Sequence, residues 1–413
     1  MGQSPIKKEK FDLSLIVQKY GGSSVANADR IRNVAKTIME TYKNGSNVVV
    51  VVSAQGDTTD DLIAKANEIN PKSSKRELDM LLSCGELMSA SLLAMAIEEL
   101  DLPVISLAGW QAGMQTDSSH TAARIIDINK KRIKRELSKR KIVIVAGFQG
   151  INKNGDVTTL GRGGSDTSAV ALAAVLDADI CQIFTDVDGI YTTDPRIVPD
   201  ASKLDEISYE EMLELASLGA NVLNNRSVEL AQKYNVKLQV LSSMNKSNGT
   251  YVKEVDDVEK ALVRGVARDN NIARISLLDI DDIPGKAYEV FSLLSGRNIN
   301  VDLIIQSVGR NGKQDMSFTV VSSVLKDALD VLAINSPAIN ARDIVWDEDV
   351  SKVSIVGSGI AANPGVAAAM FNALYKANIN IQMISTSEIK VSVLIAQADA
   401  ERAVCALHKH FDL

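Results

Sequence analysis

Short apolar runs alternate with longer amphipathic stretches over the first half of the chain, from residue 13 to about residue 241. The runs are rich in β-branched residues and predict strands, because a strand buried on both faces reads as a continuous apolar segment. The predicted strands are LSLIVQ, NVVVVVS, PVISL, KIVIVAGF, ICQIFT and VKLQVL. Periodic stretches at 76–93 and 121–137 predict helices. This alternation predicts a largely parallel sheet in an α/β domain.

A different pattern follows the polar, turn-rich residues 242–260, where we predict a domain boundary. Beyond it, residues 281–307 align without gaps with residues 361–387, with ten identities in 27 positions. Each copy has a strand before it, a Pro-Gly turn that opens a helix, and an Asn-Ile-Asn turn into a second strand. The pattern predicts a duplicated β-α-β unit whose copies pack together, because one copy is too small to bury its sheet well.

The composition of the chain excludes several classes of function and location. The chain has 413 residues, enough for two or three domains, and its net charge of -7 and 4% aromatic content argue against a nucleic-acid partner. Cys84, Cys181 and Cys405 are too scattered for a disulfide framework, which favours a reducing compartment. The first twelve residues lack the apolar segment of a signal peptide, and we find no apolar run near the ~20 residues that span a bilayer. We therefore expect a cytoplasmic protein.

The stretch VQKYGGSSV places Lys19 at the end of a predicted strand, with Gly21 and Gly22 before a helix. An ammonium, bare backbone N–H groups and serine hydroxyls at one point suit a phosphate. The phosphate-binding pattern GxxxxGK[ST] is absent. The alternative is a tight turn with a solvated lysine.

A second motif is TTLGRGGSDTSA, residues 158–169. Its three glycines, Gly161, Gly163 and Gly164, expose backbone, and Ser165, Asp166 and Thr167 are candidates to cap the helix that follows. Arg162 adds a planar fork that grips a carboxylate or phosphate. This pattern predicts anion binding, and the alternative is an ordinary capped turn.

The third motif is FTDVDGIYTTDPR, residues 184–196, at the end of a strand, where open α/β sheets bind their ligands. A calcium loop is disfavoured because Ile190 stands where an oxygen ligand is needed. Nucleotide contact is the better functional interpretation, against a solvated acidic loop. A dinucleotide fingerprint is imitated by Gly357 and Gly359, but Pro364 and Gly365 start the helix too late for it.

Histidine is scarce, with only His120, His408 and His410 in the chain. Histidine-based catalysis is therefore poorly supported. Phosphoryl transfer to a carboxylate needs no histidine base, since a carboxylic acid with a pKa near ~4 is already ionised at neutral pH.

Together these motifs resemble the aspartokinases, along nearly the whole chain after Phe11 and in the family's order. The resemblance is carried by KYGGSSV, VVSAQGDTTDDLI, CGELMSASLLA, TTLGRGGSDTSA, TDVDGIYTTDPR and the paired Pro-Gly repeats. It implies an α/β fold: an amino-acid kinase (carbamate kinase-like) α/β/α sandwich followed by two ferredoxin-like ACT domains. The implied domains are an N-terminal extension at 1–12, the kinase domain at 13–250, and ACT domains at 251–335 and 336–413.

The resemblance implies ATP-dependent phosphorylation of L-aspartate to 4-phospho-L-aspartate, the first step of lysine, threonine and methionine biosynthesis, with Mg2+ arriving with ATP and no dedicated metal site in the protein. The implied catalytic residues are Lys19 and Asp166. The implied aspartate-binding residues are Ser53, Thr59, Glu86, Arg162, Gly163, Gly164 and Ser165. The implied nucleotide-binding residues are Lys19, Tyr20, Gly21, Gly22, Phe184, Thr185, Asp186, Ile190, Tyr191, Asp194 and Arg196.

The repeats are expected to sense lysine, threonine or both, and to join the chain into a homo-oligomer. The expected effector-binding residues are Asp282, Gly285, Ile299, Asn300, Val301, Asp302, Gln306, Gly365, Val366, Asn380, Ile381, Ser387 and Glu388. Met244 precedes the repeats, so a separately translated regulatory subunit stays an alternative. If the turns are merely repeated helix starts, no effector site exists there.

Two departures from the family pattern concern ATP binding: Asn221 stands where relatives often carry a lysine, and Asn224-Asn225 where many have His-Pro. Two other functions compete with the aspartokinase interpretation. One is a kinase of the same fold for glutamate, acetylglutamate or a nucleoside monophosphate, which the repeats and the Glu86–Arg162 combination disfavour. The other is a silent amino-acid sensor, which the presence of Lys19, Arg162 and Asp166 disfavours.

Overall fold

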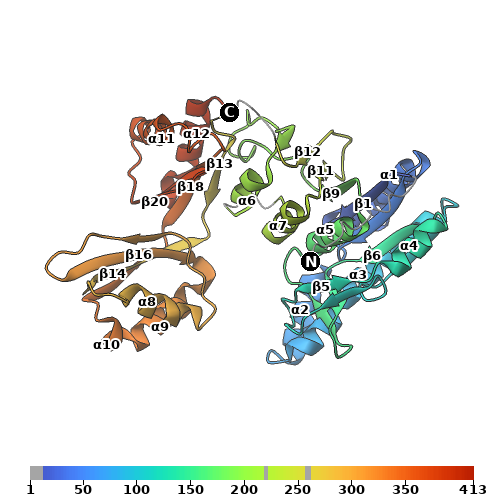
Figure 1. Cartoon of the computed structure of the whole chain (residues 1–413), viewed down its shortest axis with the longest axis horizontal. Helices are drawn as coiled ribbons and strands as arrows, with labels where there is room; N and C mark the ends of the chain where they lie inside the picture. The colour runs from blue at the N-terminus through green and yellow to red at the C-terminus, as the bar shows by residue number, and fades with distance from the viewer. Residues whose placement is uncertain (1–12, 218–221, 256–261) are drawn as a thin grey trace, which may run out of the picture. The chain divides into compact units, whose positions relative to one another are not determined.

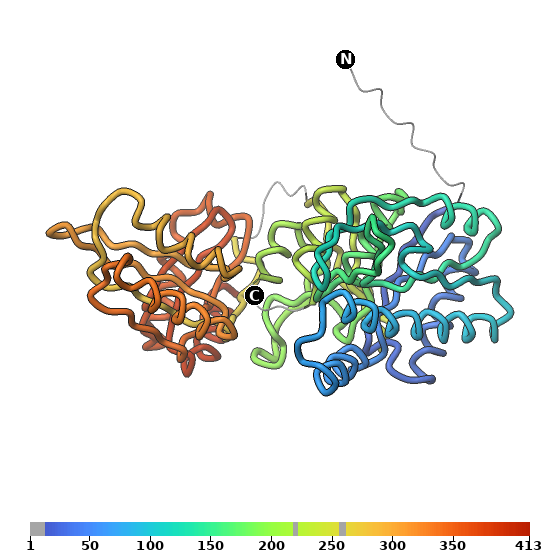
Figure 2. The backbone as a smooth tube through the Cα atoms, turned by 90° about the horizontal axis from the view of Figure 1, so that it is seen from below, coloured from blue at the N-terminus to red at the C-terminus, as the bar shows by residue number. Residues whose placement is uncertain are grey.

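The computed structural model describes residues 13–217, 222–255 and 262–413, so the predicted extension at 1–12 lies outside the described residues. Among these residues, one compact unit comprises 13–190, 203–216 and 222–255, and a second comprises 191–202, 217 and 262–413. Figure 1 labels the elements of both units, and the backbone trace of Figure 2 follows the chain by colour from blue to red.

An eight-stranded sheet forms the centre of the first unit, in the order β10-β12-β11-β9-β1-β2-β6-β3. Neighbouring strands are parallel except β11 and β12. In chain order the strands are β1 (Leu15–Tyr20), β2 (Asn47–Val52), β3 (Val104–Leu107), β6 (Ile142–Ala146), β9 (Ile180–Thr185), β10 (Glu206–Ile207), β11 (Leu238–Ser242) and β12 (Thr250–Val252). Every residue of β2 is buried, as its five consecutive valines predict.

Helices cover both faces of this sheet, which confirms the predicted α/β/α sandwich (Figure 1). Apolar side chains of α1 and α3 pack on one face, against alternate residues Val48, Val50 and Val52 of β2. Helix α5 packs against β1, β2 and β9, and α7 packs on α5. The helices of this unit are α1 (Ala28–Lys43), α2 (Thr58–Ile69), α3 (Lys75–Glu98), α4 (Lys131–Ser138), α5 (Gly164–Leu176), α6 (Tyr209–Ser217) and α7 (Asn225–Tyr234).

A second, four-stranded sheet was not predicted from the sequence. Its order is β5-β4-β7-β8, and its strands are β4 (Met114–Thr116), β5 (Ile125–Ile128), β7 (Gln149–Ile151) and β8 (Val157–Thr159). The predicted helix at 121–137 is therefore wrong over its first half, where β5 forms, and α4 begins only at Lys131. The three isoleucines of β5 are stiff, β-branched residues that favour a strand. The segment 242–260, predicted to be a separator, also contributes a strand, β12.

The second unit contains two four-stranded sheets with helices packed on them, and both copies of the repeat form the predicted strand, helix and strand. One sheet has the order β15-β16-β14-β17 and the other β13-β18-β20-β19. The strands are β13 (Gly265–Asp269), β14 (Ile272–Asp281), β15 (Ile304–Gln306), β16 (Lys313–Val321), β17 (Asp343–Asp347), β18 (Val350–Val356), β19 (Met383–Thr386) and β20 (Lys390–Ala396). The helices are α8 (Lys286–Ser295), α9 (Leu325–Ile334), α10 (Ser336–Ile339), α11 (Gly365–Lys376) and α12 (Ala400–Phe411).

The two sheets of this unit do not divide the chain between residues 335 and 336, where the sequence placed a boundary. Strand β13 precedes the first repeat but pairs with β18 of the second. Strand β17 follows residue 336 but pairs with β14 of the first. The first repeat is therefore inserted into a sheet that β13 opens and β18 continues.

The loop Tyr191–Ser202 belongs to the second unit although it follows β9 of the first. Ile197 and Val198 pack against the apolar core beneath the β13-β18-β20-β19 sheet. The carbonyl oxygen of Thr192 accepts a hydrogen bond of 2.7 Å from the N–H of Val266 in β13. A segment predicted to line a nucleotide pocket is thus fixed by the core of the repeats.

Helix α3 is long and apolar enough to span a membrane, and it is the one such helix among the residues described, although no such segment was predicted from the sequence. Half of its apolar window is buried inside the protein. Leu93 and Ile97 are fully buried in the core under the main sheet. These contacts are those of a core helix.

Candidate active site

Lys19 lies near the end of β1, and its Nζ is 2.6 Å from Oδ1 of Asp166, in the first turn of α5. Both side chains are only 12% exposed. The alternative of a solvated lysine in a plain turn is therefore wrong. An ammonium held at the carboxyl edge of a parallel sheet by one carboxylate suits an anionic ligand, because it is oriented and only partly neutralised.

The turn after β1 is packed closely against the turn after β2. The Gly56 N–H donates to the Gly22 carbonyl at 3.0 Å, and a Cβ on Gly22 would lie 2.7 Å from the carbonyl oxygen of Ala54. A Cβ on Gly21 would lie 3.4 Å from Lys19 Nζ. Glycine is needed at position 22 so that backbone alone lines this point, which fits the close approach of a phosphate.

Glu86 is the second buried charge near these turns. It lies on α3, is 3% exposed, and accepts a hydrogen bond of 3.1 Å at Oε1 from the Ala54 N–H. Its Oε2 is buried and has no hydrogen-bond partner among the described residues. Gly85 permits this approach, because a Cβ there would lie 2.7 Å from the Ala54 Cβ. Burial raises the pKa of Glu86 to about 7, and the Ala54 hydrogen bond opposes this shift.

The loop before α5 holds Arg162 with an exposed side chain between Gly161 and Gly163, whose φ angles are +78° and +71°. Asn224 Nδ2 donates to the Arg162 carbonyl at 3.2 Å, and its side chain occupies the space a Cβ on Gly163 would need. The capping predicted for Ser165, Asp166 and Thr167 is wrong: α5 begins at Gly164 with Gly163 as its cap, without a side-chain bond. Asn224 also caps the start of α7. Asn221, the other departure from the family pattern, lies outside the described residues.

Ser53 lies just after β2, and Ser165, in the first turn of α5, lies against the end of the neighbouring strand β6. A Cβ on Gly147, just after β6, would lie 2.8 Å from Ser165 Oγ. Ser53 follows β2, and its N–H donates to the Tyr20 carbonyl at 3.1 Å. Thr59 is half-buried in the first turn of α2. The structure therefore gathers much of the predicted aspartate set at the carboxyl ends of β1, β2 and β6.

The residues predicted to bind the nucleotide fall in both units of the chain. The Tyr20 and Phe184 rings stack with centroids 4.6 Å apart, and both side chains are buried, as is Ile190. Their side chains belong to the core, so any contact with ATP at these three positions would be made by their backbone. Thr185 and Asp186 remain at the end of β9, joined by a 3.0 Å hydrogen bond.

The other nucleotide candidates, Tyr191, Asp194 and Arg196, belong to the second unit. Arg196 donates through Nε and Nη2 to the Asp194 carboxylate, at 3.0 and 2.8 Å. This guanidinium lowers the pKa of Asp194. In the described ranges, no three His, Cys, Asp or Glu side chains gather as a metal site.

The predicted effector residues lie at equivalent places in the two repeats. Gly285 and Gly365 stand at the starts of α8 and α11 in open space. Ile299, Val301, Val366 and Ile381 pack into the apolar cores. Asn300, Asn380, Ser387 and Glu388 are exposed, Gln306 donates to Gln314, and Asp282 lies against Gly309.

Asp302, expected to bind an effector, is part of an ion pair and is 47% exposed. Its Oδ2 is paired with Nζ of Lys352 in β18, whose side chain is 6% exposed. In the other direction, Arg274 of β14 donates to Gln382 Oε1 at 2.9 Å. Residue 382 is the repeat equivalent of residue 302. In each direction, therefore, a basic side chain of one copy (Lys352 or Arg274) contacts an oxygen of the equivalent residue in the other copy (Asp302 or Gln382).

The parallel sheet, its glycine-lined turns and the buried Lys19–Asp166 pair define an amino-acid kinase, and the amino acid kinase family model matches residues 14–242. An ACT domain model matches residues 353–411. The chain is 49% identical over 407 residues to the aspartokinase of Corynebacterium glutamicum, covering 97% of each chain. The chain belongs to the aspartokinase family, the ATP-dependent kinases that phosphorylate aspartate.

Solved structures agree with this assignment. E. coli aspartokinase III in complex with aspartate and ADP, in the R-state, superposes with a TM-score of 0.81 at 28% identity, covering 97% of this chain and 100% of that one. The same enzyme in complex with lysine and aspartate, in the T-state, gives a TM-score of 0.76 at 27% identity, covering 96% and 99%.

Proposed function

We propose that Lys19, Glu86 and Arg162 carry the aspartokinase reaction of this chain. The observation that supports it most is Glu86: its buried Oε2 lacks a partner in the described part of the chain, close to the turns that follow β1 and β2. An ionised carboxylate in that position suits the ammonium of an amino acid. The fork of Arg162 suits the α-carboxylate, which leaves the side-chain carboxylate of aspartate to react.

In the proposed step, an oxygen of that carboxylate forms a bond to the γ-phosphorus of ATP. The bond from this phosphorus to the oxygen bridging the β- and γ-phosphates breaks, and ADP leaves with the electron pair. Aspartate is already ionised at neutral pH, so no base is required. Lys19 neutralises the charge that shifts during transfer, and Asp166 holds its ammonium in place. We propose that Mg2+ enters with ATP, held mainly by phosphate oxygens.

We further propose that the second unit is a sensor for lysine, threonine or both, with the effector bound between equivalent turns of the repeats. The E. coli enzyme crystallised with lysine in its T-state supports this by analogy. The open helix starts at Gly285 and Gly365 offer N–H groups to a carboxylate, and Asn300 and Asn380 offer amides nearby in sequence.

A homo-oligomer formed through the repeats is also proposed. Strands β15 and β19 each lie at the edge of their sheet, and the repeat equivalents Ile304 and Ile384 on them are 49% and 43% exposed. An edge strand with exposed apolar side chains is a surface that pairs readily with another chain. We propose a cytoplasmic location, in keeping with the scattered cysteines.

The test is ADP release by the purified chain with aspartate, glutamate or acetylglutamate as the acceptor, with hydroxylamine trapping to detect an acyl phosphate. We expect ADP release and hydroxamate with aspartate alone. Arg162→Lys should raise the KM for aspartate without weakening ATP binding, because lysine lacks the planar fork. Better use of glutamate or acetylglutamate would identify a related kinase, and no turnover with any acid would favour a silent sensor.

A further inference from the structure

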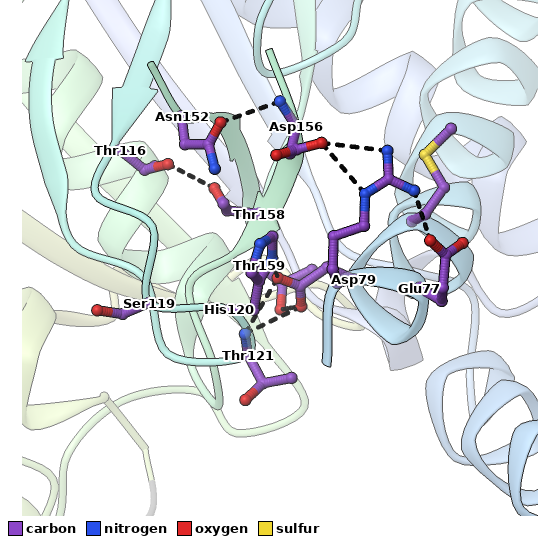
Figure 3. Close-up of polar contacts among 12 residues, drawn as sticks. Glu77, Asp79, Thr116, Ser119, His120, Thr121, Asn152, Asp156, Thr158 and Thr159 are labelled. Atoms are coloured by element: carbon purple, nitrogen blue, oxygen red, sulfur yellow. Dashed lines mark hydrogen bonds and ion pairs between the residues drawn. The ribbon is translucent and has the colours of Figure 1, made fainter. Parts of the chain in front are cut away.

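Asp79 is a fully buried carboxylate on α3 that the proposed reaction does not use. Figure 3 shows it at the centre of a polar cluster formed by α3, the turn before β5 and strand β8. Within the described ranges its partners are Thr159, Thr121 and His120. A buried charge costs stability unless several donors satisfy it, so its presence calls for a reason.

The contacts of Asp79 are short and come from three separate groups. Oδ1 accepts from Thr159 Oγ1 at 2.5 Å, and Oδ2 is 2.8 Å from His120 Nδ1. The Thr121 N–H points at both oxygens, at 3.1 and 3.0 Å. One carboxylate therefore joins the end of β8 to the turn at 120–121.

Both residues that Asp79 joins, Thr159 and Thr121, lie next to the loop that carries Arg162. Thr159 is the last residue of β8 and stands three positions before Arg162. Thr121 contacts the same loop from the side, because a Cβ on Gly161 would lie 3.1 Å from the Thr121 carbonyl oxygen. Loss of the Asp79 hydrogen bonds would therefore leave the Arg162 loop less firmly held, both at Thr159, where the loop begins, and at Gly161, where Thr121 packs against it.

Thr121 is held in an unfavourable backbone conformation. Its φ is +69°, in the left-handed region that β-branched residues avoid. Such a conformation costs about 1–3 kcal/mol and persists only where the surroundings impose it. The carboxylate of Asp79 supplies that constraint, since it accepts the Thr121 N–H.

Asp79 and Glu86 are seven residues apart on one helix, which puts them on the same face and about 10 Å apart along the axis. We propose that Asp79 is a positioning residue for aspartate, which sets the distance between the Arg162 loop and Glu86 by tying that loop to the helix that carries Glu86. The proposal rests on the aspartate-binding roles given above to Glu86 and Arg162.

The test compares Asp79→Asn, Thr159→Val and the double variant with wild type. Asp79→Asn keeps the size of the side chain but turns one acceptor into a donor facing other donors. We expect the KM for aspartate to rise about tenfold or more, because small misplacements of binding groups are costly, with the KM for ATP changed less than about threefold. Thr159→Val should act in the same direction and add little in the double variant, since both break one contact.

Asp156→Asn is the matched control. Asp156 lies beside this cluster in Figure 3 and accepts from Arg76 Nε at 3.1 Å, and among the described residues this partly exposed pair has no hydrogen bond or ion pair with Asp79 or with the Arg162 loop. We expect its kinetics to match wild type. The shift in melting temperature produced by aspartate alone gives a readout independent of turnover. It should shrink for Asp79→Asn and Thr159→Val but not for Asp156→Asn.

The proposal fails if Asp79→Asn lowers the melting temperature but leaves the aspartate KM within about twofold of wild type, which is the result of a purely structural role. It also fails if the KM values for aspartate and ATP rise together. Should Asp79→Asn not fold, Thr159→Val decides by the same criteria. Failure of the proposed reaction would appear differently, as a wild type that forms no aspartyl hydroxamate.

Discussion

The burial of Glu86 lowers the stability of the folded chain, and in the role proposed above the same buried carboxylate binds the ammonium of aspartate. Burial raises its pKa from 4.5 to about 7, so the folded chain holds the proton over a range in which the unfolded chain has lost it. The free energy of unfolding therefore falls as the pH rises from about 4.5 to about 7, and above that the folded chain carries the full cost of an ionised buried carboxylate, on the order of 3 kcal/mol by linkage.

We predict that Glu86→Gln stabilises the free protein at pH 8, because the amide has no charge to bury. The gain relative to wild type should diminish toward pH 5, where wild-type Glu86 is protonated. Urea unfolding of both proteins at the two pH values measures it. The same variant should raise the KM for aspartate, and a variant less stable than wild type at pH 8 would contradict the pKa argument.

The pH dependence of aspartate use follows from the same group. An ammonium binds the ionised carboxylate, so the KM for aspartate of the wild type should fall as the pH rises through about 7. In Glu86→Gln this dependence should be lost. Initial rates at saturating ATP across pH 6 to 8 give the comparison, and an unchanged pH profile in the variant would assign the titration to another group.

Lys19 should contribute more to the rate of phosphoryl transfer than to the binding of aspartate. We predict that Lys19→Ala lowers kcat by about a hundredfold or more, the usual effect of removing one electrostatic stabiliser, while the KM for aspartate changes much less. Lys246→Ala is the control, because it breaks an exposed ion pair with Glu40 in the same unit. A kcat within about threefold of wild type would exclude the phosphate role of Lys19.

At the scale of elements, the loop Tyr191–Ser202 depends on a buried histidine of α12. Nε2 of His408 is 3.0 Å from Thr192 Oγ1, and burial lowers the pKa of His408 below its usual 6.5. The unfolded chain then binds a proton more readily than the folded chain. Stability is therefore present above pH 6.5 and is lost as the pH falls below it.

We predict that His408→Gln flattens this acid-side loss. Calorimetric melting between pH 7.5 and 5.5 should show a smaller fall in melting temperature for the variant than for wild type. His410→Gln, on the same helix with an exposed side chain, should behave as wild type. Equal slopes for wild type and His408→Gln would show that the Thr192–His408 contact does not sense pH.

The main elements were predictable because their patterns are local. Consecutive valines, Pro-Gly turns and a repeat at a fixed shift identify β2, α8 and α11 without knowledge of their neighbours. The sheet containing β5 and β8 was missed because its strands are short and are stabilised by partners distant in sequence. Asp79 was missed for the same reason, although its spacing of seven from Glu86 on a helix was a usable signal. The burial of the Tyr20 side chain was not predictable, because the sequence around an aromatic residue beside a binding motif is the same whether its ring faces a ligand or the core.

At the scale of the whole molecule, the repeats should regulate through the crosswise contacts between their two sheets. We predict that Asp302→Asn weakens inhibition by lysine, threonine or the two together, because Lys352 loses its ionic partner between the copies. An effector inhibits only if it binds a low-activity arrangement more tightly, typically by 1–3 kcal/mol. Inhibition curves at matched aspartate concentration measure the change, with Lys313→Ala as a control away from this contact.

Cutting the chain near residue 260 is a less clean test than a point variant. It would remove the core on which Ile197 and Val198 pack, and the loss of activity would follow whether or not an effector binds. Identical inhibition of wild type and Asp302→Asn, or no inhibition of wild type at millimolar amino acid, would argue against the sensor for these effectors.

The insertion of one repeat into the sheet of the other also dictates an order of events during synthesis. Strand β13 leaves the ribosome before the inserted repeat, and its partner β18 leaves after it, with Val266 paired to Ile355 in the finished sheet. The β15-β16-β14-β17 sheet can close on itself while β13 waits unpaired. Until β18 emerges, the core that will receive the loop Tyr191–Ser202 is also missing. A nascent chain halted before residue 350 therefore lacks the packing of this loop, which follows the kinase strand β9, as well as the sheet that β18 continues.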